Sequence, residues 1–273
     1  MQKQKKNFNW KKIGLIVMWS SLALVFFISV GFTTSRERDQ HYSGIEASII
    51  DSTGHSFITA ADLLQLVQSK YGDLKLRSHS SINTTLLESI ILNNPFVASV
   101  KVFSTIDGKL HIEVKQRDPL VRVINFKNES FYIDGTGKFM PVSEKYTARV
   151  PVVNGYIFNG EAEQKVRLYS EQELEDTSVA VSRLSQVICV AECINNSPFW
   201  KSQIVQIYVN SNGDLELIPR VGDHTIIMGD ARAAEKKLNN LYHFYTEGLS
   251  KSGWRKYKTI NIKYQDQIVC TKR

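Results

Sequence analysis

The 273-residue sequence lacks the short motifs that most often mark an active site. It contains no G-x-S-x-G nucleophile turn, no S-x-x-K, no H-E-x-x-H and no phosphate-binding P-loop. The histidines show no metal-ligand spacing, so we interpret them as solvated or structural residues: His41, His55, His79, His111, His224 and His243. We therefore expect no catalytic residue, no metal site and no cofactor.

One stretch looks superficially like part of a protease motif. In Asp134-Gly135-Thr136-Gly137 the threonine stands at a different position from that in the D-T-G of aspartic proteases. Acidic and glycine residues in this order are typical of a turn after a strand. We interpret the stretch as such a turn.

Cysteine is scarce, with three residues, Cys189, Cys193 and Cys270. An odd and small number excludes a scaffold held together by disulfides. Cys189 and Cys193 are four residues apart in a segment that we interpret as helical. Their Cβ atoms then point in nearly the same direction, which suits a disulfide poorly. We predict that both are small buried residues, and no neighbouring histidine indicates a metal site.

The positive charge is not spread along the chain. The formal net charge is +7, from 34 basic and 27 acidic residues. Residues 1–12 carry five lysines and no acid, so residues 33–273 hold 29 basic against 27 acidic residues. This near balance argues against a nucleic-acid-binding surface. The rest of the chain has an ordinary globular composition without low-complexity tracts or evident repeats.

A long apolar segment follows the basic arm. Residues Ile13 to Phe32 contain no charged side chain, and a helix of this length covers a hydrocarbon core of roughly 30 Å. The preceding lysine excess predicts a cytoplasmic N-terminus and an extracytoplasmic C-terminal part. The exit, Val30 to Ser35, lacks an A-x-A-like cleavage site. This favours an uncleaved transmembrane anchor over the alternative, a cleaved signal peptide.

The residues after a polar linker, 33–42, predict a small α+β domain. Ile45 to Ile50 read as a strand, and Thr59 reads as the N-cap of a helix that ends near Gly72. A second helix begins near Ser81 to Asn83 and ends before Pro95. Alternating apolar residues at 97–102 and 110–114 flank an Asp-Gly turn, which indicates a hairpin. The predicted order is β-α-α-β-β.

The second half predicts a β-rich domain with flanking helices. We expect a helix over 173–195, a hairpin around Asn212-Gly213, and a strand at 226–230 that leads into another helix. The last strand is expected over 257–264. The predicted fold class is therefore α+β, with a single N-terminal transmembrane helix ahead of both domains.

Several segments, in order, resemble the FtsQ/DivIB cell-division proteins. Asn94 to Val123 is similar to the end of their POTRA domain, with Arg117 and Pro119 in the expected places and Gln116 where the family often has glutamate. Tyr257 to Tyr264 resembles their I-D-L-R-Y segment, with asparagine and lysine replacing the charged pair. The resemblance covers nearly the whole chain. It divides the chain into an arm (1–12), an anchor (13–32), a linker (33–42), a POTRA domain (43–119) and a C-terminal β domain (120–273).

The resemblance implies a division scaffold and not an enzyme. Such a protein recruits bitopic partners of the FtsB/DivIC and FtsL type and helps couple division to the septal peptidoglycan synthase. It implies a single-pass protein of the cytoplasmic (inner) membrane at the division septum, with no nucleic acid as a partner. The alternative from another class is a membrane-anchored envelope enzyme such as a peptidoglycan hydrolase.

The C-terminal strand is the candidate binding site. A terminal strand at a sheet edge leaves backbone N–H and C=O groups unpaired, which favours pairing with a partner strand. The resemblance implies these partner-binding residues: Tyr264, Gln265, Asp266, Gln267, Ile268 and Val269. Two alternatives stay open at this stage. The strand could simply complete the core, and Gln265 to Gln267 could form a loop.

Overall fold

The computed structural model of the protein describes residues 15, 17–29, 42–50, 54, 56–72, 81–105, 107–157, 178–264 and 266–273. The chain from 42 onward contributes to two compact units. The first holds residues up to 50, 59–93 and 100–114, and the second holds residues 51–58, 94–99 and 115–273. Each unit is described separately below.

Near the N-terminus, residues 17–29 are helical and expose their apolar side chains. Within the described residues, no helix has both the length and the apolar character that a membrane span requires. The predicted anchor over 13–32 includes residues outside the described part of the chain. The predicted arm and most of the predicted linker also lie outside it.

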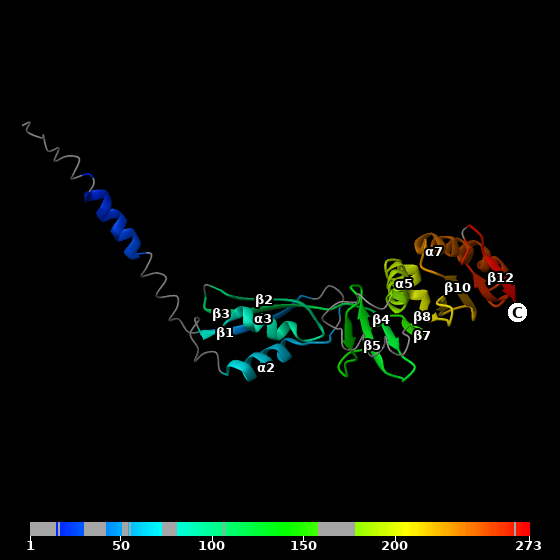
Figure 1. The fold of residues 1–273 in the computed structure, drawn as a ribbon, viewed down its shortest axis with the longest axis horizontal. Helices are drawn as coiled ribbons and strands as arrows, with labels where there is room; N and C mark the ends of the chain where they lie inside the picture. The colour runs from blue at the N-terminus through cyan, green and yellow to red at the C-terminus, as the bar shows by residue number, and fades with distance from the viewer. Residues whose placement is uncertain are drawn as a thin grey trace, which may run out of the picture. The chain divides into compact units, whose positions relative to one another are not determined.

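The first unit has the predicted β-α-α-β-β order (Figure 1). Its strands form a three-stranded sheet in the order β1-β3-β2. The elements are β1 (Gly44–Ile50), α2 (Ala60–Tyr71), α3 (Thr84–Leu92), β2 (Val97–Ser104) and β3 (Lys109–Gln116). Alternate residues of β3 are buried, as are Leu63 and Val67 of α2 and Leu87 and Ile91 of α3.

Local chemistry sets the ends of α2. The Thr59 hydroxyl accepts a hydrogen bond from the Asp62 N–H at 3.3 Å, and the Asp62 carboxylate accepts one from the Thr59 N–H at 3.0 Å. This reciprocal capping box satisfies two N–H groups at the helix start. The helix ends at Gly72, whose φ of 73° is in the left-handed region that glycine tolerates. The predicted start and stop of this helix are confirmed.

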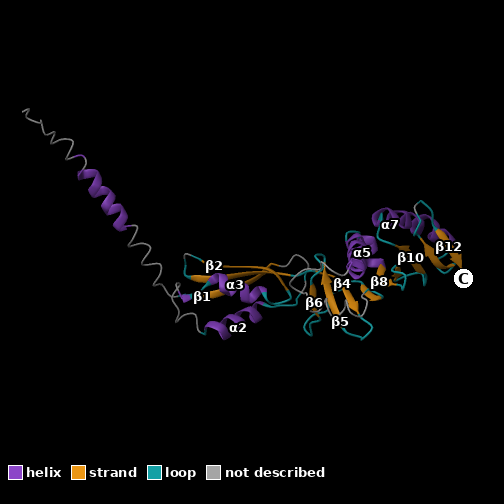
Figure 2. Cartoon of the chain, in the orientation of Figure 1, coloured by secondary structure: helices purple, strands orange, loops and turns teal. Residues whose placement is uncertain are grey.

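The second unit is built on a nine-stranded sheet (Figure 2). The strand order is β12-β11-β10-β9-β8-β7-β4-β5-β6. Most neighbours are antiparallel, but the pairs β4–β7, β7–β8 and β10–β11 are parallel. The strands are β4 (Pro119–Ile124), β5 (Ser130–Asp134), β6 (Phe139–Pro141), β7 (Val152–Gly155), β8 (Ile204–Val209), β9 (Leu215–Pro219), β10 (Thr225–Gly229), β11 (Tyr257–Asn261) and β12 (Val269–Lys272).

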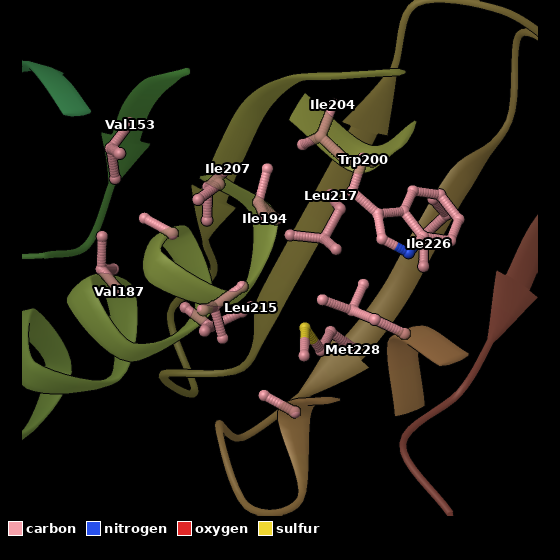
Figure 3. Close-up of a cluster of buried hydrophobic side chains, with 14 of the residues drawn as sticks. Val153, Val187, Ile194, Trp200, Ile204, Ile207, Leu215, Leu217, Ile226 and Met228 are labelled. Carbon is pink, nitrogen blue, oxygen red and sulfur yellow. The ribbon is translucent and has the colours of Figure 1, made fainter. Parts of the chain in front are cut away.

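The helices of this unit pack their apolar side chains with those of the sheet in a common core. Figure 3 shows Val187 and Ile194 of α5 among the sheet residues Val153, Ile207 and Leu217. All five are fully buried. The helical elements are α5 (Ser178–Asn195), α6 (Pro198–Gln203), α7 (Ala234–His243), the π-helix η3 (Phe244–Leu249) and α8 (Ser250–Ser252).

The parallel pairing of β7 with β8 depends on a glycine at the end of β7. Gly155 has a φ of 96°, and a Cβ atom there would lie 2.2 Å from the carbonyl oxygen of Val209. Glycine alone allows this approach of two backbones. The next residue continues the pairing, because the Tyr156 N–H donates to the same carbonyl at 2.8 Å.

The predicted turn at Asp134 is confirmed, and Asp134 takes part in a partly buried ion pair. The Asp134 carboxylate accepts hydrogen bonds from the backbone N–H groups of Thr136 and Lys138, both at 2.9 Å. Its other oxygen accepts one from the Arg117 guanidinium at 2.7 Å. Arg117 also donates to the carbonyls of Pro95 and Val97. Arg117, which carries part of the family resemblance, therefore joins three segments of the second unit.

Candidate partner-binding edge

The last strand of the chain, β12, forms one edge of the nine-stranded sheet. It pairs antiparallel with β11, where Cys270 lies opposite Ile260 and Val269 opposite Asn261. Among the described residues, no strand pairs with the other side of β12. Its outward N–H and C=O groups are therefore available to a strand from another chain.

Of the predicted partner-binding residues, Val269 begins β12 and the others precede it in the chain. Tyr264 and Val269 are 54% and 48% exposed. Ile268 is half-buried and packs against the core. Asp266 forms an ion pair with Lys236 of α7 at 2.8 Å. Gln267 is also exposed, whereas Gln265 lies outside the described residues.

The structure corrects the prediction that the last strand runs over 257–264, because a further strand, β12, follows this segment and forms the edge of the sheet. β11 ends at Asn261 and not at Tyr264. The Asn261 side chain accepts a hydrogen bond from the Lys263 N–H at 2.9 Å, which turns the chain away from the sheet. Tyr264, Asp266 and Gln267 therefore lie in the connection between β11 and β12, in agreement with the alternative that part of this segment is a loop.

A shallow groove lies beside this connection. Its lining includes Lys236 and Asn240 of α7 together with Ile262, Tyr264 and Gln267. It brings four of the six predicted residues near α7, because Asp266 and Ile268 also line it. Ile268, which lines the groove, directly precedes Val269 at the start of β12.

A buried lysine fixes α7 below the groove. The ammonium group of Lys237 donates to the carbonyls of Met228 and Asp230, at 3.2 and 2.9 Å, and to the Asp230 carboxylate at 3.2 Å. The hydrogen bond from Arg232, followed by that from Lys237, lowers the pKa of Asp230 to about 2. Asp230 therefore stays ionised and holds the start of α7 against the end of β10.

The C-terminal edge is strongly basic, a property that the net charge of the whole external part conceals. Residues 250–273 contain seven basic residues and one acid, so residues 33–249 contain 22 basic and 26 acidic residues. On β11 and β12 and at their ends, Lys256, Lys258, Lys272 and Arg273 are exposed. A charge balance taken over residues 33–273 conceals this patch. A count over the last 24 residues reveals it.

Among the residues that the structure describes, the cysteines and histidines form no second candidate site. Cys189, Cys193 and Cys270 are free thiols, and Cys189 is exposed, so the prediction that both α5 cysteines are buried is wrong. Burial raises the pKa of the Cys193 thiol, and the neighbouring Cys189 adds to this effect. Within the described ranges, no group of three His, Cys, Asp or Glu side chains is arranged to hold a metal ion.

Comparisons with known proteins give two matches along the chain. Residues 41–115 match a family model described as a POTRA-like domain. Residues 118–271, which are more than half of the chain, match a family model described as FtsQ/DivIB, C-terminal related. No curated protein matches the chain. The two matched segments follow one another in the order that the sequence resemblance implies, and the chain belongs to the FtsQ/DivIB family.

Proposed function

We propose that this protein is a single-pass scaffold of the cell-division machinery that binds other septal membrane proteins through the free edge of β12. The FtsQ/DivIB family is a family of non-enzymatic division scaffolds. The observation that supports this binding mode is the position of β12, whose outer side is unpaired within the described part of the chain. The proposed domains are a POTRA domain over 43–119 and a C-terminal domain over 120–273.

A helix over 13–32 anchors the protein in the cytoplasmic membrane, with the arm inside and both domains outside. Residues 17–29 are helical, and their large apolar side chains are 57–72% exposed. Lipid tails would cover this surface favourably, and the lysines ahead of it retain the arm in the cytoplasm. The short linker holds the domains near the membrane surface, where septal partners are also anchored.

The proposed binding mode is the addition of a partner strand to β12. Backbone hydrogen bonds along the free edge supply affinity, and the side chains near Tyr264, Ile268 and Val269 supply specificity. The partner is a small bitopic protein of the FtsB/DivIC type, itself paired with one of the FtsL type. Through these partners the scaffold helps to couple division to septal peptidoglycan synthesis.

A backbone substitution in β12 tests this mode. The Arg273 N–H donates to the Lys256 carbonyl at 3.3 Å, so the N–H groups of Cys270 and Lys272 face outward by strand alternation. Lys272→Pro removes one outward donor without removing a bond to β11. We expect it to weaken capture of the partner's extracytoplasmic segment by the full-length protein, measured as a Kd in nanodiscs, by about tenfold.

The matched control is Lys272→Ala, which removes the same charge and keeps the N–H group. If Lys272→Pro and Lys272→Ala have the same Kd as the wild-type protein, strand addition at β12 is wrong.

Tyr264→Glu tests the side-chain contribution in the same assay, with Phe126→Glu as its control, because Phe126 is 65% exposed on the distant β4–β5 turn. Equal Kd values for these two variants would remove Tyr264 from the site.

A further inference from the structure

A cleft of about 590 Å³ lies at the end of the sheet where β10 and β11 begin. The loop between β9 and β10 forms one wall, with Arg220, Val221 and Asp223. Trp254 and Arg255, just before β11, form the other wall, and the buried His224 also lines the cleft. This cleft shares no residue with the groove beside Tyr264.

The loop that forms the cleft is held in one conformation. Gly222 and Asp223 have φ values of 110° and 48°. A positive φ costs energy at a non-glycine residue, so the backbone of Asp223 is strained. A Cβ atom at position 222 would lie 2.3 Å from the His224 ring, so only glycine fits. His224 in turn makes a 2.7 Å hydrogen bond between its Nε2 atom and the Tyr245 hydroxyl, and both residues are buried. These contacts restrict the conformations of the loop, which lowers the entropy cost of binding a ligand there.

The cleft is continuous with the free edge of β12. The Arg273 guanidinium donates to the Asp223 carboxylate at 2.5 Å and also to the Asp223 backbone carbonyl. Lys272, the last residue of β12, lies opposite Tyr257, the first residue of β11. A chain that pairs with β12 and continues past Lys272 therefore emerges beside this cleft.

The charges in the cleft favour an acidic ligand. Arg220 and Arg255 are exposed, and neither side chain forms an ion pair or a hydrogen bond with another described residue. Asp223 is the one acidic residue in the lining, and Arg273 already pairs with it. Val221 and the half-buried Trp254 add apolar surface to the lining of the same cleft. An aspartate or glutamate side chain matches this combination, because arginine binds carboxylates with two parallel hydrogen bonds.

We propose that this cleft binds an acidic side chain of the partner segment that pairs with β12, just beyond the point where the pairing ends. This inference rests on the proposed function, since it requires a strand along β12. It adds a specificity determinant at the opposite end of β12 from Tyr264. A partner with a carboxylate at this position is selected over one with a neutral or basic residue.

The double variant Arg220→Glu with Arg255→Glu tests the proposal. Both side chains are exposed, and the Arg220 backbone N–H keeps its bond to the Gln203 carbonyl. The probe is the extracytoplasmic segment of the small bitopic partner, bound to the full-length protein in nanodiscs. We expect Kd to rise by about tenfold or more, with a weaker dependence on salt concentration than in the wild-type protein.

The control is Lys127→Glu with Lys138→Glu, an equal change of charge at exposed positions outside the cleft. An equal Kd for the two double variants overturns the proposal. Loss of binding to phosphatidylglycerol vesicles without a change in partner Kd also overturns it, because the cleft then serves a lipid surface. The two proposals fail separately: normal binding by Lys272→Pro contradicts strand addition, whereas normal binding by the arginine variant contradicts only the cleft.

Discussion

At the scale of single residues, the buried imidazole of His224 determines part of the response of the fold to pH. Burial holds the pKa of His224 below its usual value of about 6.5, against a smaller opposite effect of a hydrogen bond to the Gly222 backbone. The charge of Arg273 lowers this pKa further, and the charge of Asp223 raises it by less. Below about pH 6.5 the unfolded chain protonates this ring while the folded chain leaves it neutral. The free energy of unfolding therefore decreases as the pH falls from about 6.5 towards the lower pKa of the folded state.

His224→Gln should remove this pH dependence. Glutamine is neutral at all these pH values and carries groups that can still bond to the Tyr245 hydroxyl. We expect the wild-type protein to lose more stability than the variant between about pH 7 and pH 5. Denaturant unfolding followed by tryptophan fluorescence measures this, because Trp200 and Trp254 lie 5.2 and 5.3 Å from the Tyr245 ring. Parallel pH curves for the two proteins would contradict the prediction.

Which residues could be predicted depends on how far apart in the chain their partners are. Thr59 and Asp62 are three positions apart, and their pattern predicts the capping box that the structure contains. Arg117 and Asp134 are 17 positions apart, and Asp223 and Arg273 are 50 positions apart. No local pattern pairs such residues. They meet because the sheet brings their strands together.

The error at Cys189 has a similar origin. The buried stripe of α5 runs through Leu184, Val187, Ala191 and Ile194. Cys189 is off this stripe and faces solvent. Its small apolar character indicated burial, but its position on the helix decided otherwise. The periodicity of the whole helix was the better guide.

At the scale of secondary-structure elements, local signals placed most helices and hairpins correctly. The turn at Asn212-Gly213 joins β8 to β9, and Gly213 has a φ of 87°, as such turns require. Local sequence signals did not predict the order of the strands in the sheet. β7 pairs in parallel with both β4 and β8, and these strands are joined to it by long connections. Such pairings follow from the packing of the whole unit and not from local preference.

The capping box makes α2 a sensitive element of the first unit. Thr59→Ala removes the side chain that accepts the Asp62 N–H. We expect a loss of about 1 kcal/mol in the free energy of opening of α2, because one N–H group at the helix start loses its partner. Hydrogen exchange of the α2 amides in the full-length protein measures this loss directly.

Ser69→Ala is the matched control on the same helix. Ser69 is exposed, and among the described residues its hydroxyl bonds to the Leu66 carbonyl of the same helix. Alanine favours the helix at such a position, so protection from exchange should stay equal or increase. Equal loss of protection in the two variants would show that the capping box does not determine the stability of α2.

At the scale of the whole molecule, we propose that the anchor over 13–32 and the free edge of β12 act together. The proposed partners each span the same membrane, so they meet this protein in two dimensions. Tethering raises the effective concentration of one binding surface near the other without any new contact. A single edge strand and a basic cleft offer modest surfaces, and attachment to the membrane lets modest surfaces suffice.

Exchanging the anchor tests whether residues 13–32 act as a tether while β12 supplies the binding surface. If residues 13–32 serve only as a tether, an unrelated apolar helix of the same length and orientation should preserve septal recruitment of the partner. Residues 33–273 released outside the membrane behind a cleavable signal peptide should recruit it poorly, because an advantage of about 10²-fold or more in effective concentration is lost. Fluorescence of the labelled partner at division sites, and the length of cells depleted of the wild-type protein, measure both outcomes.

Normal division with the released protein would contradict the role of residues 13–32 as a tether. Failure of the exchanged helix, with normal insertion and expression, would instead show that the side chains of the native helix contact a partner within the bilayer.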